Sequence, residues 1–582
     1  MTIQQHLDFK DLFPAEQPLN ISQYLDGISR YDLIRLAMLF IHMKEYDDAR
    51  SYTITFTSGD NPAFAQYMLN RLSVLKKGNP DKSFYIGSNI TGLKLLQYIY
   101  MSPPIDKTTK TEADIVVDIT KALSLINQNN INDPNLENRG VNQDSILPSI
   151  NKDGGTEDFI WAKNIYCNQV VYSDFVNYPI ENLSIAQILK ADRFFKFCET
   201  NPKFKILTDK FLKEYGCSNS KEYLKAIIRL IGIVLEAIKT TGYPIVKISS
   251  GETFGLDLLS SISLDKDEIL PMASNYDSLD FRNKPLIKIS DSEFYITSNT
   301  FVIERLYNSI KFNLNNINIA TNADPKKRVM SDVFGNYTSL FSEKFLFNNS
   351  IESIYKKYNY KLIEGGAGKC DYFVKSGNKV FLFECKDIEY ASNIKQSDDF
   401  SEIKDYIWKK LVVKAGKPIG AGQIVRDIKD ISDNTTTWGN DLTKNLQIFP
   451  ILVLSKPLYS TLGFNYMLNQ WFSEELSKES ISNRIRIRPL LIIDMDTLLL
   501  LEDSLASKRL KLETEIENYY SFIKKKGAFH QKYLSFSDYI ISQRSQYVFS
   551  KSSQSLFYDS LTKSLFDDDE QIIESQASTS KS

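Results

Sequence analysis

Apolar residues recur every three to four positions through much of the first half of the chain, which is the spacing of amphipathic helices. The pattern predicts helices over residues 31–42, 63–75, 185–199, 205–214 and 221–239. Between residues 127 and 157 the periodicity is lost, and Asn, Asp, Gly, Pro and Ser predominate. We therefore expect residues 1–242 to form a mainly helical N-terminal domain with a flexible loop near 127–157.

The pattern changes after Tyr243 to short β-like runs. Two of them, residues 285–289 and 293–296, flank a turn, and a helix is predicted over residues 300–312. Residues 243–325 are interpreted as a small α+β connecting region.

Strands and helices alternate through residues 326–503, which indicates an α/β layer fold. The predicted elements are a helix at 337–347, strands at 360–363, 370–375 and 379–386, a long helix at 401–431, a strand at 447–454, a helix at 464–476 and a strand at 484–493. Residues 504–566 are predicted to be a C-terminal helical segment, with a helix at 510–524. Residues 567–582 are acidic and rich in Ser, which predicts a disordered tail.

Composition narrows the choice of function. The 582 residues carry 70 Lys and Arg against 72 Asp and Glu, so no global positive field attracts a nucleic acid and any such partner must be bound locally. The three histidines are far apart in sequence, which argues against a histidine-based nuclease or phosphodiesterase site. They are His6, His42 and His530. Carboxylates are left to carry any hydrolytic chemistry.

Cysteine usage and hydropathy indicate the compartment. The five cysteines form no CxxC pair, which argues against a zinc ribbon or a disulfide framework and favours reduced thiols. The amino terminus lacks the order of a signal peptide, and no apolar stretch approaches the ~20 residues of a membrane span. A cytoplasmic protein without a membrane partner is expected.

Residues 370–386, CDYFVKSGNKVFLFECK, form the segment with the clearest chemistry. Two β-rich runs meet at Gly377 and Asn378, whose residue types suit the positive φ angles of a tight hairpin turn. With these two residues as the loop, Asp371 faces Glu384 across the hairpin. Alternation along the strands then predicts one apolar face and one face that carries Asp371, Glu384 and Lys386.

Directly opposed carboxylates repel each other and destabilise a strand pair unless a cation lies between them. Two carboxylate ligands suit Mg²⁺ or Mn²⁺, and the carbonyl oxygen of Cys385 could supply another ligand. Lys386, two residues beyond Glu384, is placed to orient or deprotonate the attacking water and to stabilise charge on a phosphate. The pattern therefore predicts a site for phosphodiester hydrolysis.

An Asp followed about a dozen residues later by Glu-x-Lys across a hairpin resembles the PD-(D/E)XK nuclease superfamily. Glu343 on the preceding helix and Gln423 on the following one match further positions of that family, and the resemblance covers residues 326–503. It implies a restriction-endonuclease-like core, a mixed sheet flanked by helices, in which Glu343 approaches the metal and Gln423 belongs to the catalytic set. Cys370 stands where the family name has Pro, a residue without a chemical role.

Plainer interpretations exist for each signal. Charges at every second position also occur on the solvated face of an edge hairpin. Glu343 could be an ordinary surface partner of a lysine, and Gln423 a simple helix residue. Basic residues near Trp408 could hold phosphates or only form a solvated helix face; they are Lys404, Lys409, Lys410, Lys414, Lys417 and Arg426. Asp494 and Asp496 are interpreted as a helix cap.

The function expected from these residues is a Mg²⁺-dependent nuclease, an endonuclease that acts on DNA rather than RNA. By analogy with the family, a regulatory protein partner and a role in bacterial defence against phage are also expected. The alternative is a catalytically inactive nucleic-acid-binding or scaffolding protein that keeps the same fold.

Overall fold

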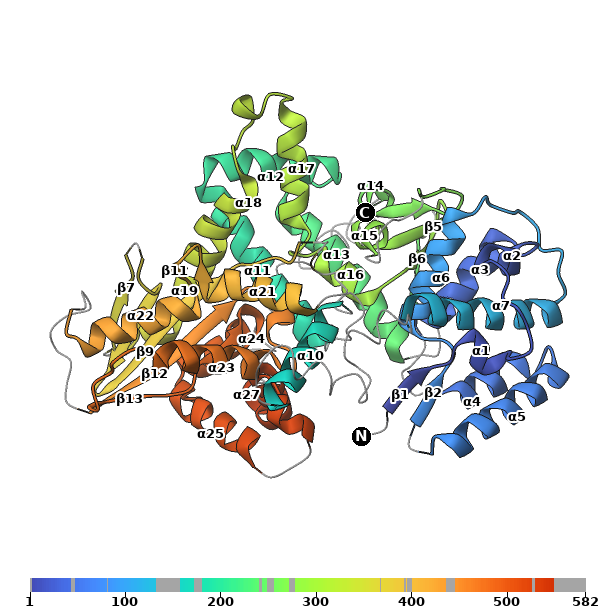
Figure 1. Ribbon diagram of the computed structural model, residues 1–582. Helices are drawn as coiled ribbons and strands as arrows, with labels where there is room; N and C mark the ends of the chain where they lie inside the picture. Colours follow the sequence, from blue (N-terminus) through green and yellow to red (C-terminus); the bar gives the residue numbers. More distant parts are fainter. Residues whose placement is uncertain are drawn as a thin grey trace, which may run out of the picture. The chain divides into compact units, whose positions relative to one another are not determined.

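The computed structural model describes most of the chain. The described residues are 3–42, 48–80, 82–131, 157–171, 180–239, 243–248, 256–271, 278–358, 360–366, 368–391, 394, 400–435, 445–525 and 529–548. Most of the expected loop at 127–157, the end of the C-terminal segment and the whole expected tail at 567–582 lie outside these residues. Helices and two larger sheets make up a mixed α/β protein (Figure 1).

Contacts divide the chain into two compact units. The first comprises Met1–Ile146, Tyr215–Cys217 and Ala226–Arg305, and the second comprises Leu147–Glu214, Ser218–Lys225 and Leu306–Ser582. This division differs from the one drawn along the sequence. Helices α10 (Glu157–Val171), α11 (Ile180–Thr200) and α12 (Pro202–Glu214) belong to the unit that contains the hairpin. Apolar residues of α10 pack in the same core as the hairpin strands.

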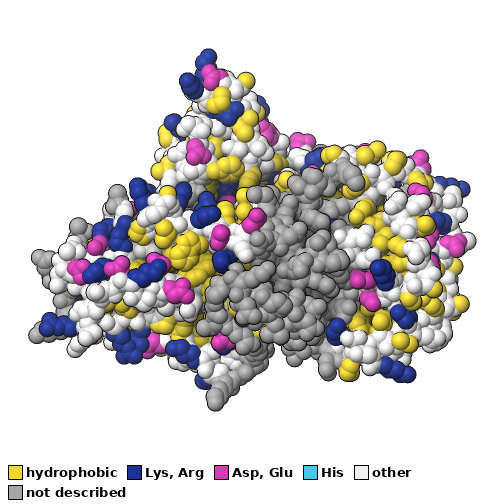
Figure 2. Space-filling view, in the orientation of Figure 1, with side chains coloured by type: hydrophobic (Ala, Val, Ile, Leu, Met, Phe, Trp, Pro, Cys, Tyr) yellow, Lys and Arg dark blue, Asp and Glu magenta, His cyan; other side chains and the backbone are white. Residues whose placement is uncertain are grey.

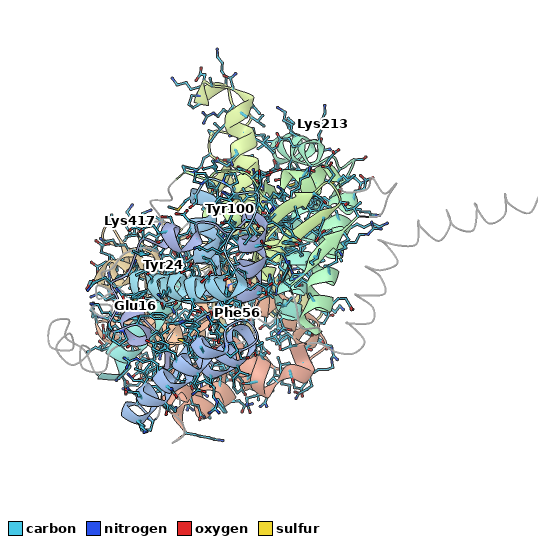
Figure 3. The ribbon with its side chains drawn as sticks, turned by 90° about the vertical axis from the view of Figure 1, so that its right-hand side faces the viewer. Glu16, Tyr24, Phe56, Tyr100, Lys213 and Lys417 are labelled. Carbon is cyan, nitrogen blue, oxygen red and sulfur yellow. The ribbon has the colours of Figure 1, made fainter. Side chains whose placement is uncertain are left out.

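The first unit combines helices with a four-stranded sheet of order β3-β6-β5-β4. Its longer helices are α3 (Arg30–Ile41), α5 (Pro62–Gly78), α6 (Asn89–Met101) and α7 (Glu112–Ile126), and its sheet strands are β3 (Ile245–Lys247), β4 (Ser263–Asp265), β5 (Leu286–Ser290) and β6 (Glu293–Ile296). Helices α3 and α6 approach closely because Gly92 has no side chain. A Cβ there would lie 2.6 Å from the backbone nitrogen of Ile41. Figure 3 labels Tyr100, which lies on α6.

The second unit is built on a mixed six-stranded sheet of order β13-β12-β9-β8-β7, with β14 also paired to β12. Its strands are β7 (Lys361–Glu364), β8 (Tyr372–Ser376), β9 (Lys379–Lys386), β12 (Leu446–Leu454), β13 (Ile485–Ile487) and β14 (Leu491–Asp494). Strands β7, β8 and β9 are antiparallel neighbours, whereas β12 runs parallel to β9, β13 and β14. Strand β9 therefore lies inside the sheet, with a partner on each side.

The hairpin register is confirmed. Phe373 pairs with Leu382 and Ser376 pairs with Lys379, which leaves Gly377 and Asn378 as the two-residue loop. Gly377 has a φ of 59°, whereas Asn378 is not among the residues with positive φ, so the turn needs only one such residue.

The expected contrast between an apolar and a charged face of the hairpin is wrong. Phe373, Val380 and Leu382 share the face of Glu384 and are fully buried against helices α10, α21 (Phe400–Leu411), α22 (Ala421–Ser432) and α23 (Phe464–Ser477). Phe381 and Phe383 on the other face contact Tyr355 of α19 (Phe347–Tyr355). Helices cover both faces, as expected for a central strand with a parallel neighbour.

Three predicted elements are broken in the structure. The single helix expected at 401–431 is two helices, α21 and α22, separated by a small hairpin of β10 (Val413–Lys414) and β11 (Lys417–Pro418). Ala415, Gly416 and Gly420 have positive φ there, which no α-helix accommodates. Pro489 separates β13 from β14 within the expected strand at 484–493, and the helix expected at 300–312 is divided between α16 (Asn299–Glu304) and α17 (Ile310–Thr321).

No helix in the described part of the chain combines the length and the apolar character needed to cross a bilayer.

Candidate functional site

Asp371 and Glu384 come together where the hairpin opens. Asp371 immediately precedes β8, and the register continued by one position places it beside Glu384 near the end of β9. The carboxylate of Asp371 accepts a hydrogen bond from the backbone N–H of Cys385, with 2.7 Å between Oδ2 and N. Burial raises the pKa of Asp371, while Lys386 and this hydrogen bond act in the opposite direction. The predicted neighbourhood of the two carboxylates is thus present in the structure.

Glu384 is fully buried, which is unusual for a carboxylate. Its Oε1 atom lies 2.7 Å from Nζ of Lys386, and its Oε2 atom accepts a hydrogen bond of 3.0 Å from Nε2 of Gln423. Burial and the charge of Asp371 raise the pKa of Glu384 to about 8, against the opposing effect of Lys386. The structure therefore brings Gln423 and Lys386 onto the same carboxylate.

Lys386 is mostly buried among acidic groups. Although burial by itself lowers its pKa, the charges of Glu384, Asp371 and Glu343 raise the pKa above its usual range. The side chain is therefore an ammonium at neutral pH. Of the two roles expected for Lys386, orientation and charge stabilisation fit this state, whereas deprotonation of water requires the lysine to lose its proton first.

Glu343 reaches the same site from η6, a π-helix over Tyr337–Leu346. Its Oε1 atom lies 4.0 Å from Nζ of Lys386. Burial raises the pKa of Glu343 to about 7, although Lys386 and a hydrogen bond from the backbone N–H of Asp387 lower it. Glu343 is consequently not a solvated surface glutamate, and it can gain or lose a proton near neutral pH.

Gln423 is oriented by the close approach of α22 to the end of α21. Gly420 has a φ of 52°, and a Cβ at Gly422 would lie 2.2 Å from the carbonyl oxygen of Val412. These two glycines allow the first turn of α22 to lie against the backbone of the preceding segment. Gln423 then donates hydrogen bonds both to Glu384 and to the carbonyl oxygen of Lys369.

Asp427 is a residue of this region that the sequence analysis missed. It lies one helical turn after Gln423, is fully buried, and accepts a hydrogen bond of 2.6 Å from the backbone N–H of Cys370. Lys369 pairs with it at 3.5 Å. The spacing of four residues from Gln423 on one helix was the available signal, because such residues share a face. Asp427 fixes the loop that leads into Asp371.

The oxygen donors at this site are those expected to bind the predicted divalent ion. Within the described ranges, no group of three or more His, Cys, Asp or Glu side chains is arranged to hold a metal. Two carboxylates are nevertheless a common protein contribution to Mg²⁺, which keeps waters and binds substrate oxygens. Oε1 of Glu384 is buried without a hydrogen bond of acceptable geometry, despite its proximity to Lys386. Asp371 and Glu384 thus fit an ion with few protein ligands. The Cys385 carbonyl and Glu343 remain predicted ligands.

The phosphate contacts considered near Trp408 remain a prediction. Trp408 is partly buried and packs edge-on against Trp471 of the core, with 5.2 Å between ring centres. Arg426 donates a hydrogen bond to the carbonyl oxygen of Gly368. On the face seen in Figure 2, basic and acidic side chains are interspersed over the second unit. The predicted helix cap is confirmed at Asp494, which accepts a hydrogen bond from the backbone N–H of Thr497, whereas Asp496 pairs with the buried Lys190.

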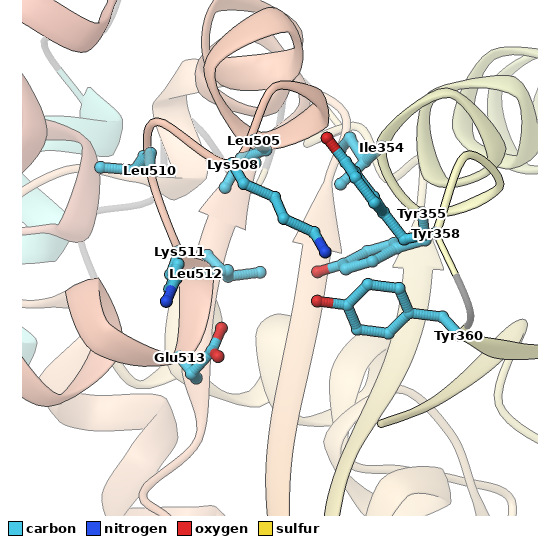
Figure 4. A pocket seen from close by; sticks show the side chains of 10 residues that line it. All are labelled: Ile354, Tyr355, Tyr358, Tyr360, Leu505, Lys508, Leu510, Lys511, Leu512 and Glu513. Atoms are coloured by element: carbon cyan, nitrogen blue, oxygen red, sulfur yellow. The ribbon is translucent and has the colours of Figure 1, made fainter. Parts of the chain in front are cut away.

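A cavity of about 180 Å³ lies on the opposite face of the sheet (Figure 4). Tyr355, which packs on Phe381 and Phe383, forms part of its wall, and the ammonium of Lys508 lies 3.6 Å from the ring centre of Tyr358. None of the predicted catalytic residues lines this cavity. It is therefore separate from the acidic site.

Comparisons of the chain with protein-family models, with curated proteins and with solved structures give no significant match.

Proposed function

We propose that the protein is a Mg²⁺-dependent nuclease that hydrolyses phosphodiester bonds, in DNA rather than RNA, at the site formed by Asp371, Glu384 and Lys386. The observation that carries the proposal is the full burial of Glu384 beside a second carboxylate. Burial of neighbouring like charges is unfavourable in a purely structural site, whereas a divalent cation between them offsets the repulsion.

Each residue has a role in this reaction. Asp371 and Glu384 would hold the ion, which lowers the pKa of water and neutralises charge on the phosphate when it is bound. The ammonium of Lys386 stabilises negative charge on the phosphate and orients the attacking water. Gln423 holds the second oxygen of Glu384 in place.

Glu343 completes the proposed set. Because its pKa is about 7, Glu343 can accept a proton from the attacking water.

A restriction-endonuclease-like core is part of the proposal. It is supported by the antiparallel β7, β8 and β9, the parallel β12 and the helices on both faces of the sheet.

The test compares wild-type protein with Lys386→Ala and Lys379→Ala on plasmid, single-stranded DNA and RNA, with Mg²⁺, with Mn²⁺ and with a chelator. Lys379 is the matched control, since it begins the same strand and pairs with Glu513 at 3.2 Å, at the end far from the carboxylates. Loss of one donor that stabilises charge in the transition state costs about 10²–10³ in rate. We expect that loss for Lys386→Ala only.

Two results would overturn the proposal. Equal cleavage by wild type and Lys386→Ala would remove this site from the reaction. If the wild-type protein cleaves none of the substrates in the presence of metal, the alternative is favoured, an inactive binding or scaffolding protein.

A further inference from the structure

Asp387, the residue directly after Lys386, joins three elements through one carboxylate. Its Oδ2 atom accepts a hydrogen bond of 2.8 Å from the hydroxyl of Ser342 on η6. Its Oδ1 atom accepts one of 2.5 Å from the hydroxyl of Ser455, which follows β12. Only 3% of the Asp387 side chain is exposed. The end of β9 is therefore tied to η6 and to β12 by a single buried group.

The backbone of Asp387 adds a second link to η6. Its N–H faces the carboxylate of Glu343, the residue next to Ser342, closely enough to lower the pKa of that carboxyl. Asp387 thus contacts two consecutive residues of η6, one through its side chain and one through its main chain. We refer to Asp387, Ser342 and Glu343 together as the clasp.

A buried cation lies beside the carboxylate of Asp387. Nζ of Lys311, on α17, lies 3.9 Å from Oδ1 of Asp387 and also pairs with Glu389. Lys456 pairs with Glu389 at 2.6 Å. A buried carboxylate is costly unless it is hydrogen-bonded and compensated. Two hydroxyl donors and a neighbouring ammonium meet that condition for Asp387.

The conformation of η6 gives contacts from outside the helix a role in orienting its side chains. The segment Tyr337–Leu346 is a π-helix, a conformation that is uncommon and frequent at functional sites. One of its wide-turn bonds runs from the N–H of Phe347 to the carbonyl oxygen of Ser342. A side chain that projects from such a segment needs contacts outside the helix to fix its direction. The clasp supplies them at Ser342 and Glu343.

We infer that Asp387 is a positioning residue of the proposed nuclease site: it holds η6 on the end of β9 so that Glu343 reaches the group formed by Glu384 and Lys386. The inference rests on the proposed function. Asp387 itself acts through Glu343, and its carboxylate is occupied by the two serine hydroxyls.

The decisive variant is Ser342→Ala, which removes one hydrogen bond of the clasp and leaves every proposed catalytic group in place. Ser339→Ala is the matched control, because Ser339 lies on the same π-helix but is exposed, and its hydroxyl donates a hydrogen bond to the carbonyl oxygen of Gly335, in the short helix Val333–Asn336 that leads into η6. Loss of a buried hydrogen bond costs about 0.5–1.5 kcal/mol net, so we expect kcat to fall by a factor between about 2 and 13 for Ser342→Ala, with KM unchanged. Asp387→Asn should lose more, since an amide nitrogen cannot accept the second serine hydrogen bond.

Hydrogen exchange across residues 337–346 provides a second measurement. Exchange should be faster in Ser342→Ala than in Ser339→Ala, with the rest of the chain unchanged. Equal kcat for the two serine variants in an active protein overturns the inference and leaves the nuclease proposal intact. An inactive wild type overturns the nuclease proposal and the inference with it, so the two failures are distinguished.

Discussion

The side-chain amide of Gln423 donates a hydrogen bond to Glu384, with 3.0 Å between Nε2 and Oε2. The contact joins the first turn of α22 to the end of β9, two elements separated by the small β10–β11 hairpin and the whole of α21. It directs a neutral donor at a buried carboxylate whose other oxygen lies beside Lys386.

Removal of that donor should weaken the response to metal. In Gln423→Ala, Glu384 loses a hydrogen bond that stabilises its charged form, and the Mg²⁺ concentration for half-maximal cleavage should rise about tenfold. Titration of cleavage rate against Mg²⁺ measures this. Gln470→Ala is the control, because Gln470 is a partly buried residue of α23 whose amide bonds to Glu474, away from the site. An unchanged midpoint in Gln423→Ala would show that the contact does not serve the metal.

The raised pKa of Glu384 predicts a pH-dependent stability in the absence of metal. Between its ordinary value of 4.5 and about 8, the unfolded chain has lost this proton while the folded protein retains it. The folded state binds more protons there, so the free energy of unfolding falls as the pH rises through this window.

Glu384→Gln should remove that contribution. Denaturant unfolding in a chelator at pH 5, 6, 7 and 8 should show a steeper fall for wild type than for the variant. Glu343, with a pKa of about 7, acts in the same direction over a narrower window and is unchanged in both proteins. Parallel curves would mean that Glu384 does not titrate in this range.

Metal binding should stabilise the folded protein through Asp371. A ligand at one hundred times its dissociation constant adds about 2.7 kcal/mol to the free energy of unfolding. Thermal unfolding with increasing Mg²⁺ or Mn²⁺ should therefore raise Tm for wild type and much less for Asp371→Asn, which keeps the size of the side chain but loses its charge. The same rise for Asp371→Asn would place the ion elsewhere. No rise for either protein would count against a metal held by these carboxylates.

Gly422→Ala should reduce stability and activity together. The added Cβ would meet the carbonyl oxygen of Val412, a backbone atom, so α22 must shift and carry Gln423 away from Glu384. Overpacking of this kind costs about 1–3 kcal/mol. Denaturant unfolding and cleavage rates test this, with Gly366→Ala as control, since nothing lies within 4 Å of a Cβ there. Wild-type values for Gly422→Ala would contradict the close approach of α22.

The hairpin and its register follow from the sequence alone. Gly377 and Asn378 mark the loop, and alternation along two short strands then assigns Asp371, Glu384 and Lys386 to one side. These features are local, because turn geometry and the two-residue repeat of a strand depend on the adjacent backbone. The cap at Asp494 is local in the same way.

The burial of the site was decided by the tertiary structure. Strand β12 pairs parallel to β9, and helices then cover both faces, so Glu384 is fully buried although the sequence of the hairpin favours an exposed charged face. The break between α21 and α22 and the contact of Ser342 with Asp387 also depend on packing between segments distant in sequence. Residue periodicity predicts on which face of its own helix or strand a side chain lies. The element that meets that side chain is set by long-range packing, which no local pattern contains.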